Sequence, residues 1–193
     1  RQGVEDAEEI MKSVALALGC TPYDIVLAST GVIGRPYPMD KIRTHLESLR
    51  YPFESNDLLR AAQGIMTTDT VPKVASALIG DGPARVVGIA KGVGMIEPNM
   101  ATLITLFLTD ARLAPGELRP LFRAAMDATF NCLSVDTDTS TSDTAAIMAN
   151  GAAGFVDRAD FAKALDEVAL SLTKQVARDG EGATKLLTVT VDR

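Results

Sequence analysis

The sequence predicts a layered fold of the α/β or α+β class, in which mixed sheets pack against helices. Its 193 residues, of which 47% are hydrophobic and 23% charged, suit a globular protein of about one domain. The predicted helices and strands follow one another without a regular β-α-β repeat, which disfavours a doubly wound parallel sheet. Two strand patterns flank the turn sequence Gly80-Asp81-Gly82-Pro83 and predict a hairpin.

Apolar residues at helical spacing predict the helices. The first helix carries acidic residues in its first turns, where they favour the helix dipole, and Gly19 ends it. Pro38 stands just before the second helix, as prolines often do. The predicted helices are Val4–Leu18, Met39–Leu49, about Asp57–Ile65, about Pro115–Ala128 and about Asp160–Arg178.

Short apolar runs bounded by turn residues predict the strands. Thr102–Thr109 is apolar on both faces, which is typical of a buried strand. Ala145–Ala149 is an Ala-rich segment that ends at Gly151 and is assigned to neither class. The predicted strands are Asp24–Ala28, Val74–Ile79, Arg85–Ala90, Thr102–Thr109 and one that begins near Leu186.

Composition and charge exclude several classes of function. The net charge is −6 and no basic stretch is present, which disfavours binding to nucleic acid or to a membrane surface. The apolar runs are too short to span a bilayer. The single histidine, His45, excludes a zinc site with several imidazoles, and it is interpreted as a solvated surface residue. Cys20 and Cys132 lie far apart, which predicts reduced, buried thiols in a cytoplasmic protein.

Thr102 opens the predicted buried strand after a loop that contains Gly92, Gly94 and Pro98. A threonine hydroxyl becomes an effective nucleophile when a base takes its proton, and cutting the preceding peptide bond frees the residue's own α-amine for that task. The reference pKa of an α-amine is about 7.7–8.0, so much of it is neutral near pH 8. This chemistry needs no histidine. A threonine at the start of a strand also has a plain structural interpretation, because β-branched residues favour strands.

Five segments, in order along the chain, resemble the ornithine acetyltransferase (glutamate N-acetyltransferase) family. Lys91–Leu103 is similar to the autocleavage segment of that family. Asp136-Thr137-Asp138, where most members carry glycine at the middle position, resembles the branch found in clavulanic acid gene clusters. The five segments are Ser29–Gly34, Gly64–Thr70, Lys91–Leu103, Phe130–Thr144 and Asp179–Lys185.

The resemblance implies a self-processing enzyme with a ping-pong mechanism. The precursor would cut itself between Ala101 and Thr102, so that residues 1–101 end an α chain and residues 102–193 begin a β chain of one partial catalytic domain. Thr102 would take the acetyl group of N-acetylornithine and pass it to glutamate. Thr30, by its hydroxyl, and Gly31, by its backbone N–H, would hold the oxyanion.

The resemblance also implies the substrate site, the assembly and the fold. Thr67, Lys91, Thr102 and Glu181 would bind substrate, with Lys91 suited to a carboxylate and Glu181 to an ammonium group. It implies an (αβ)2 assembly in the cytoplasm, with no cofactor and no metal, and leaves open whether acetyl-CoA is a second donor. The implied fold is the ornithine acetyltransferase/DmpA-like fold.

The chain starts at Arg1 and ends in a strand-like sequence, which predicts an internal fragment that is incomplete at both ends. Two other functions stay open. One is a self-processing amidase or aminopeptidase of related fold, which would pass the acyl group to water. The other is a truncated chain without catalytic activity. Acetyl transfer to added glutamate, release of free acetate, or the absence of self-cleavage separates the three.

Overall fold

The computed structural model describes residues 2–52, 57–96, 103–136, 140–187 and 189. The chain divides into two compact units, Arg1–Asp57 and Leu58–Arg193. Helices and a mixed sheet together give an α+β architecture, as the sequence predicts.

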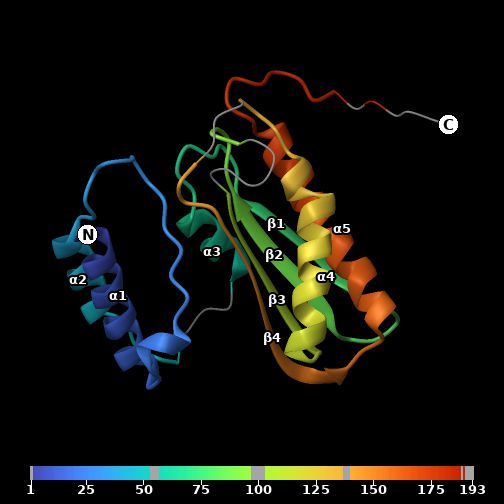
Figure 1. Ribbon diagram of the computed structural model, residues 1–193, viewed down its shortest axis with the longest axis horizontal. Coiled ribbons are helices and arrows are strands. Elements are labelled where there is room, and N and C mark those ends of the chain that lie inside the picture. Colours follow the sequence, from blue (N-terminus) through green and yellow to red (C-terminus); the bar gives the residue numbers. More distant parts are fainter. Residues whose placement is uncertain (1, 53–56, 97–102, 137–139, 188, 190–193) are drawn as a thin grey trace. The chain divides into compact units, whose positions relative to one another are not determined.

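The first unit contains helix α1 (Gln2–Leu18), the short 3-10 helix η1 (Pro22–Asp24) and helix α2 (Met39–Glu47) (Figure 1). Both α-helices confirm the sequence prediction. Gly19, with a φ of +71°, ends α1 in the left-handed conformation that favours glycine. An ion pair joins the two helices, because Arg43 donates to both carboxylate oxygens of Glu9 at 2.6 and 3.0 Å.

The predicted strand Asp24–Ala28 is wrong. Asp24 belongs to η1, and in the described part of the first unit residues 25–30 form neither helix nor strand. A strand needs a partner for its backbone groups, and every strand in the described residues pairs within the second unit. Val26, in the middle of this segment, is 75% exposed.

The second unit is built on a four-stranded sheet in the order β1-β2-β3-β4 (Figure 1). β1, β2 and β3 pair antiparallel, and β4 pairs parallel to β3. The predicted hairpin is confirmed as β1 and β2. The predicted strand Thr102–Thr109 is confirmed as β3, but burial on both of its faces is not, because Leu106 is half-buried and Leu108 is exposed. The strands are β1 (Lys73–Leu78), β2 (Arg85–Lys91), β3 (Ile104–Arg112) and β4 (Thr144–Phe155).

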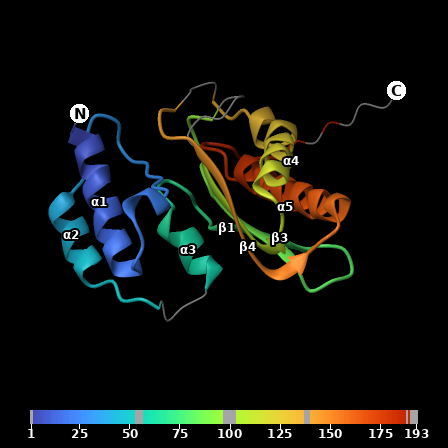
Figure 2. The ribbon, with the colours of Figure 1, turned by 60° about the horizontal axis from the view of Figure 1, so that its bottom comes forward.

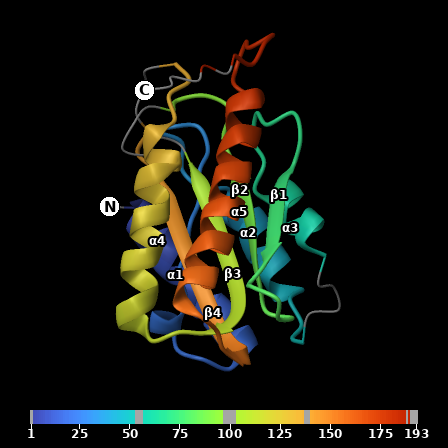
Figure 3. The same ribbon diagram turned by 90° about the vertical axis from the view of Figure 1, so that its right-hand side faces the viewer.

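Helices α4 (Pro115–Ala128) and α5 (Arg158–Arg178) cover one face of this sheet (Figure 3), and the short α3 (Leu58–Gly64) packs on β1 and β2 from the other face (Figure 2). All three helices confirm the sequence prediction. The core lies between the sheet and helices α4 and α5. Phe107 of β3 is fully buried there, in edge-to-face contact with Phe122 of α4 and with Phe130.

β4 contains the Ala-rich segment that sequence patterns leave unassigned. Alanine and glycine are poor strand formers, so the local sequence gives little signal. The strand forms through parallel pairing with β3, with Ile147 opposite Phe107. The strand predicted to begin near Leu186 lies largely outside the described residues, and its described positions Leu186, Leu187 and Val189 have no regular structure.

Two further observations concern exposure. Cys20 and Cys132 are exposed free thiols, so the prediction that they are buried is wrong. His45 is exposed on α2, as predicted. Among the described residues, the structure contains no helix whose length and apolar character would let it cross a membrane.

Candidate functional site

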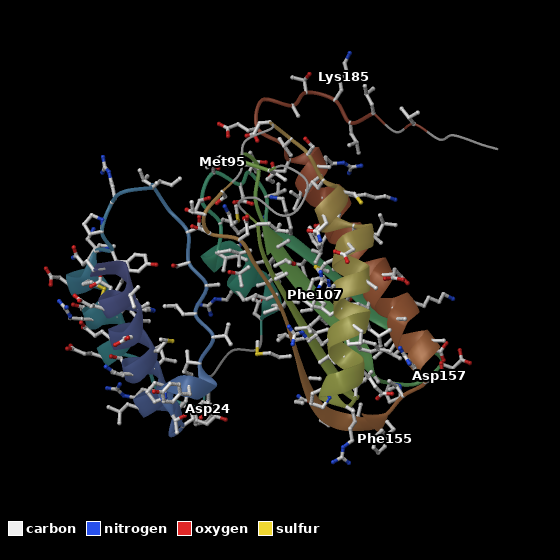
Figure 4. The ribbon with its side chains drawn as sticks, viewed as in Figure 1. Asp24, Met95, Phe107, Phe155, Asp157 and Lys185 are labelled. Carbon is white, nitrogen blue, oxygen red and sulfur yellow. The ribbon has the colours of Figure 1, made fainter. Side chains whose placement is uncertain are left out.

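The candidate site lies at one end of the sheet in the second unit. β1 begins there with Lys73, β2 ends there with Lys91, and β3 begins there with Ile104. The register places Lys73 opposite Ala90, and Lys91 opposite Ile104. In Figure 4, Met95 marks this end of the sheet, whereas the label of Asp157, where α5 begins, marks the opposite end.

Lys91 is buried and contacts Thr67. Its side chain is 2% exposed, and its Nζ donates a hydrogen bond to the Thr67 hydroxyl oxygen at 2.8 Å. Burial lowers the pKa of Lys91 below its ordinary value. The Asp69 carboxylate, 3.8 Å from Nζ, opposes this shift, and the nearby Lys73 ammonium adds to it. The structure therefore brings two of the residues predicted to bind substrate into direct contact.

Asp69 and Lys73 stand beside this pair and were not singled out by the sequence analysis. Lys73 Nζ donates to Asp69 Oδ1 at 2.8 Å, and neither side chain is exposed to solvent. Asp69 also accepts hydrogen bonds from the backbone N–H of Gly92 at 2.7 Å and of Thr67 at 3.1 Å. Burial raises the pKa of Asp69, but these hydrogen bonds outweigh burial and hold the pKa below its ordinary value.

Asp179, the residue after α5, completes the buried group of charges. Its Oδ2 accepts from Lys73 Nζ at 2.6 Å and from the backbone N–H of Thr70 at 3.1 Å, and the Thr70 hydroxyl donates to its Oδ1. Burial raises the pKa of Asp179, but the hydrogen bonds from Lys73 and Thr70 lower it further than burial raises it. Asp179 thus ties the end of α5 to the start of β1.

Glu181 follows two residues later and lies against the loop after β2. Its backbone N–H donates to the Val93 carbonyl oxygen at 2.6 Å. Its carboxylate lies so close to Gly94 that any side chain on Gly94 would collide with it. A pocket of about 330 Å³ opens beside these residues, and its lining residues are Thr68, Thr70, Val93 and Arg178–Ala183.

The predicted cleavage pair, Ala101 and Thr102, lies outside the described residues. The next residue, Leu103, is held on both sides. Its backbone N–H donates to Asp143 Oδ1 at 2.7 Å, and its carbonyl oxygen accepts from the N–H of Thr144 at 2.8 Å. Burial raises the pKa of Asp143, and the hydrogen bond from Leu103 opposes that shift.

The last described residues before positions 97–102 are held in a similar way. Asp136 accepts hydrogen bonds from the backbone N–H groups of Met95 at 2.5 Å and of Ile96 at 2.9 Å. Met95 has a φ of +54°, a conformation that a non-glycine residue rarely adopts. Two carboxylates, Asp136 and Asp143, therefore hold the described residues that flank the predicted cleavage bond on its two sides.

Thr30 and Gly31 belong to the first unit, and the structure describes them there alone. Thr30 is half-buried, and Gly31 is exposed with open space at the position that a side chain would fill. The neighbouring Ser29 hydroxyl is hydrogen-bonded to the Tyr37 hydroxyl. Their predicted role in the oxyanion hole stays a prediction.

Sequence reasoning missed Asp69, Lys73, Asp179 and Asp143. A weak signal for the first two was present, because a carboxylate and a lysine four residues apart stand in the polar segment that leads into an apolar strand. Asp69, Asp143 and Asp179 all belong to segments that resemble the family, although no role was assigned to them. Asp179 stands 106 residues after Lys73, so their contact depends on the fold.

Comparison with known proteins identifies relatives along the whole chain. The family model described as "ArgJ family" matches residues 1–193. The chain is 56% identical over 190 residues to the Glutamate N-acetyltransferase Oat2 of Streptomyces clavuligerus, covering 98% of this chain and 48% of that protein. It is 55% identical to the Arginine biosynthesis bifunctional protein ArgJ 2 of a Nostoc species, covering 98% of this chain and 49% of that protein.

A more distant relative agrees with these two. The Arginine biosynthesis bifunctional protein ArgJ of Thermus thermophilus is 46% identical over 191 residues, covering 98% of this chain and 49% of that protein. The chain spans about half the length of the curated relatives that it matches. The match to the family model from the first residue to the last, together with these identities, shows that the chain belongs to the ArgJ family.

Proposed function

We propose that this chain forms part of the catalytic region of a glutamate N-acetyltransferase that moves an acetyl group from N-acetylornithine to glutamate. Membership of the ArgJ family and the 56% identity to a protein named Glutamate N-acetyltransferase support this function. The observation that carries the proposal is the register of two strands. Lys91, a buried cation at the end of β2, lies opposite Ile104 at the start of β3, and Ile104 follows Thr102 by two residues in the sequence. The strand register thus places Lys91 beside the strand that follows the Ala101–Thr102 segment in the sequence.

The proposed enzyme activates itself by cutting the peptide bond between Ala101 and Thr102. The Thr102 hydroxyl then attacks the acetyl carbonyl carbon of N-acetylornithine, and its proton passes to the Thr102 α-amine. Thr30 and Gly31 donate hydrogen bonds to the oxyanion that forms. Collapse of this intermediate breaks the C–N bond, and the departing amine of ornithine takes the proton.

The second half of the cycle repeats the first in reverse. The amine of glutamate attacks the acetyl-threonine ester, the C–O bond breaks, and the Thr102 hydroxyl recovers a proton. Lys91, with Thr67 beside its ammonium group, pairs with a substrate carboxylate, and Glu181 pairs with a substrate ammonium group. The α-carboxylate is common to donor and acceptor, so Lys91 serves both substrates, whereas Glu181 serves the side-chain ammonium group of N-acetylornithine, because the one amine of glutamate is the attacking nucleophile.

The proposal extends to the assembly and the cell compartment. Cleavage at Ala101 gives an α chain and a β chain that stay together as an (αβ)2 assembly in the cytoplasm, within the ornithine acetyltransferase/DmpA-like fold. The chemistry uses the threonine hydroxyl and its amine and needs no cofactor. Acetyl-CoA as a second donor is consistent with the names of the bifunctional relatives.

Nuclear magnetic resonance with acetyl-labelled N-acetylornithine tests the proposal. The complete protein should produce labelled N-acetylglutamate when glutamate is added, and little free acetate. Thr102→Ala should abolish the product, whereas Thr102→Ser, which keeps a hydroxyl and an α-amine, should retain part of the rate. Labelled free acetate without N-acetylglutamate would instead indicate an amidase.

A further inference from the structure

Lys73 is a buried cation to which neither the sequence nor the proposed mechanism gives a role. Its side chain is 0% exposed and donates hydrogen bonds to Asp69 at 2.8 Å and to Asp179 at 2.6 Å. Replacing a buried group of charges with apolar residues is often neutral or stabilising. Stability alone therefore does not explain why three charged side chains are buried here. Their role is better inferred from the segments of the chain to which they are hydrogen-bonded.

Each carboxylate holds a different segment of the chain. Asp69 accepts from the backbone of Thr67 and from that of Gly92 at the end of β2. Asp179, at the end of α5, accepts from the backbone and the hydroxyl of Thr70. Lys73 bridges the two carboxylates, so it connects the Thr67–Thr70 segment, the end of β2 and the end of α5.

These three segments carry the residues proposed to bind substrate. Thr67 is itself held by Asp69, Lys91 stands directly before Gly92, and Glu181 stands two residues after Asp179. The Asp69 carboxylate also lies 3.8 Å from Lys91 Nζ. A displacement of either carboxylate would therefore change the spacing between the cationic and the anionic group of the substrate site.

We propose that Asp69, Lys73 and Asp179 form a positioning network that fixes the separation of Lys91 and Glu181, and with it the affinity for substrates that carry both a carboxylate and an ammonium group. The role of Lys91 and Glu181 as substrate ligands rests on the proposed function. The three residues of the network position these ligands and stand outside the proposed reacting groups. Disturbing them should raise KM more than it lowers kcat.

Two variants and a control test this network in the complete protein. Lys73→Met removes the bridging charge but keeps a long side chain. Thr70→Val removes only the hydroxyl that donates to Asp179, at an exposed position where folding should persist. Asp157→Ala removes two hydrogen bonds, at 2.8 and 3.1 Å, from the first residues of α5 at its opposite end (Figure 4). This control weakens the same helix away from the network.

Both network variants should raise the KM for N-acetylornithine, Lys73→Met by about 10- to 100-fold, the loss that a misplaced binding group causes. Their kcat should change less than their KM. Asp157→Ala should lower the melting temperature and leave KM unchanged. Unchanged KM in folded Lys73→Met and Thr70→Val, or a fall confined to kcat, would overturn the positioning role.

Amide hydrogen exchange provides a second readout that does not depend on the reaction. Thr67 and Glu181 should exchange faster in Lys73→Met than in the wild type, and their rates should not change in Asp157→Ala. If the wild-type protein transfers no acetyl group, the proposed function fails, and the exchange rates still decide whether the network positions these segments. Equal exchange at both residues in Lys73→Met and the wild type would contradict it.

Discussion

The Lys91 ammonium donates a hydrogen bond to the Thr67 hydroxyl over 2.8 Å, across 24 positions of sequence. This contact joins a strand end to a polar segment that has no regular structure of its own. Among the described residues, the buried ammonium has the neutral Thr67 hydroxyl as its hydrogen-bond partner and the Asp69 carboxylate 3.8 Å away. A lysine held in this way has the capacity to accept a carboxylate from a ligand.

The affinity for N-acetylornithine should fall as the pH rises. Lys91 binds a carboxylate only in its protonated form, and burial lowers its pKa below the ordinary value. The loss of binding should therefore begin at a lower pH than for an exposed lysine. KM measured from pH 7 to 10 should rise for the wild type. In Lys91→Met it should be high and nearly independent of pH, and a parallel rise in both proteins would exclude Lys91 as the titrating group.

The stability of the second unit should fall in acid. The pKa values of Asp69 and Asp179 are below their ordinary values in the folded protein. Their contribution is fully present above the unfolded pKa of about 3.9 and is lost as the pH falls through the folded values. Urea unfolding between pH 6 and 2.5 should show this loss, and Asp179→Asn should show a smaller one.

The loss of unfolding free energy in Asp179→Asn at neutral pH should distinguish a buried ion pair from a surface ion pair. Removing one partner of a buried ion pair costs about 3–5 kcal/mol of unfolding free energy. Asp127 pairs with Arg123 at 3.8 Å on the surface of α4, where its side chain is 58% exposed. Asp127→Asn should cost less than about 1 kcal/mol. Equal costs for the two variants would contradict the buried network.

Gly88 in β2 should be intolerant of any side chain. A Cβ at this position would meet Leu172 Cδ1 at 2.8 Å and Val168 Cγ1 at 3.0 Å, where α5 packs on the sheet. Gly88→Ala should therefore lower the unfolding free energy by about 1–3 kcal/mol through overpacking. Gly116 in α4 has open space around its Cβ position, so Gly116→Ala should be neutral or stabilise by up to about 1 kcal/mol. Thermal or urea unfolding of both variants checks the contrast.

Thr30→Ala should slow acetylation of the enzyme by about 10²–10³-fold if its hydroxyl holds the oxyanion. Thr21 is a suitable control because its hydroxyl donates to Asp24 at 2.8 Å in an exposed turn of the same unit. Thr21→Ala should affect stability alone. Single-turnover acetylation of folded Thr30→Ala at the wild-type rate would remove Thr30 from the oxyanion hole.

Local sequence patterns predict the elements whose signals are local. The hairpin of β1 and β2 follows from apolar runs on either side of a Gly- and Pro-containing turn, and α4 and α5 follow from helical spacing. β4 gives no such signal, because Ala145–Ala149 is a poor strand former and becomes a strand only through parallel pairing with β3. The strand pattern at Asp24–Ala28 fails for the opposite reason, since its β-propensity has no partner strand among the described residues of the first unit.

The candidate site likewise contains some residues that the sequence predicts and others that it does not. Resemblance to the family singled out Thr67 and Lys91, and their hydrogen bond agrees with a shared site. The charges that hold them were not predicted, because a buried lysine bridging Asp69 and Asp179 depends on contacts across 106 residues. Asp143 was missed for a related reason. Its hydrogen bond with Leu103 joins the residue just before β4 to the residue just before β3.

Acetylation of Thr102 is the central claim, and mass spectrometry of the complete protein tests it most directly. The protein is incubated with N-acetylornithine, without glutamate, quenched in acid and mapped by peptide. The account predicts a chain whose first residue is Thr102, with one acetyl group on its hydroxyl that disappears when glutamate is added before the quench. An active protein with the Ala101–Thr102 bond intact, or with the acetyl group on another residue, would contradict it.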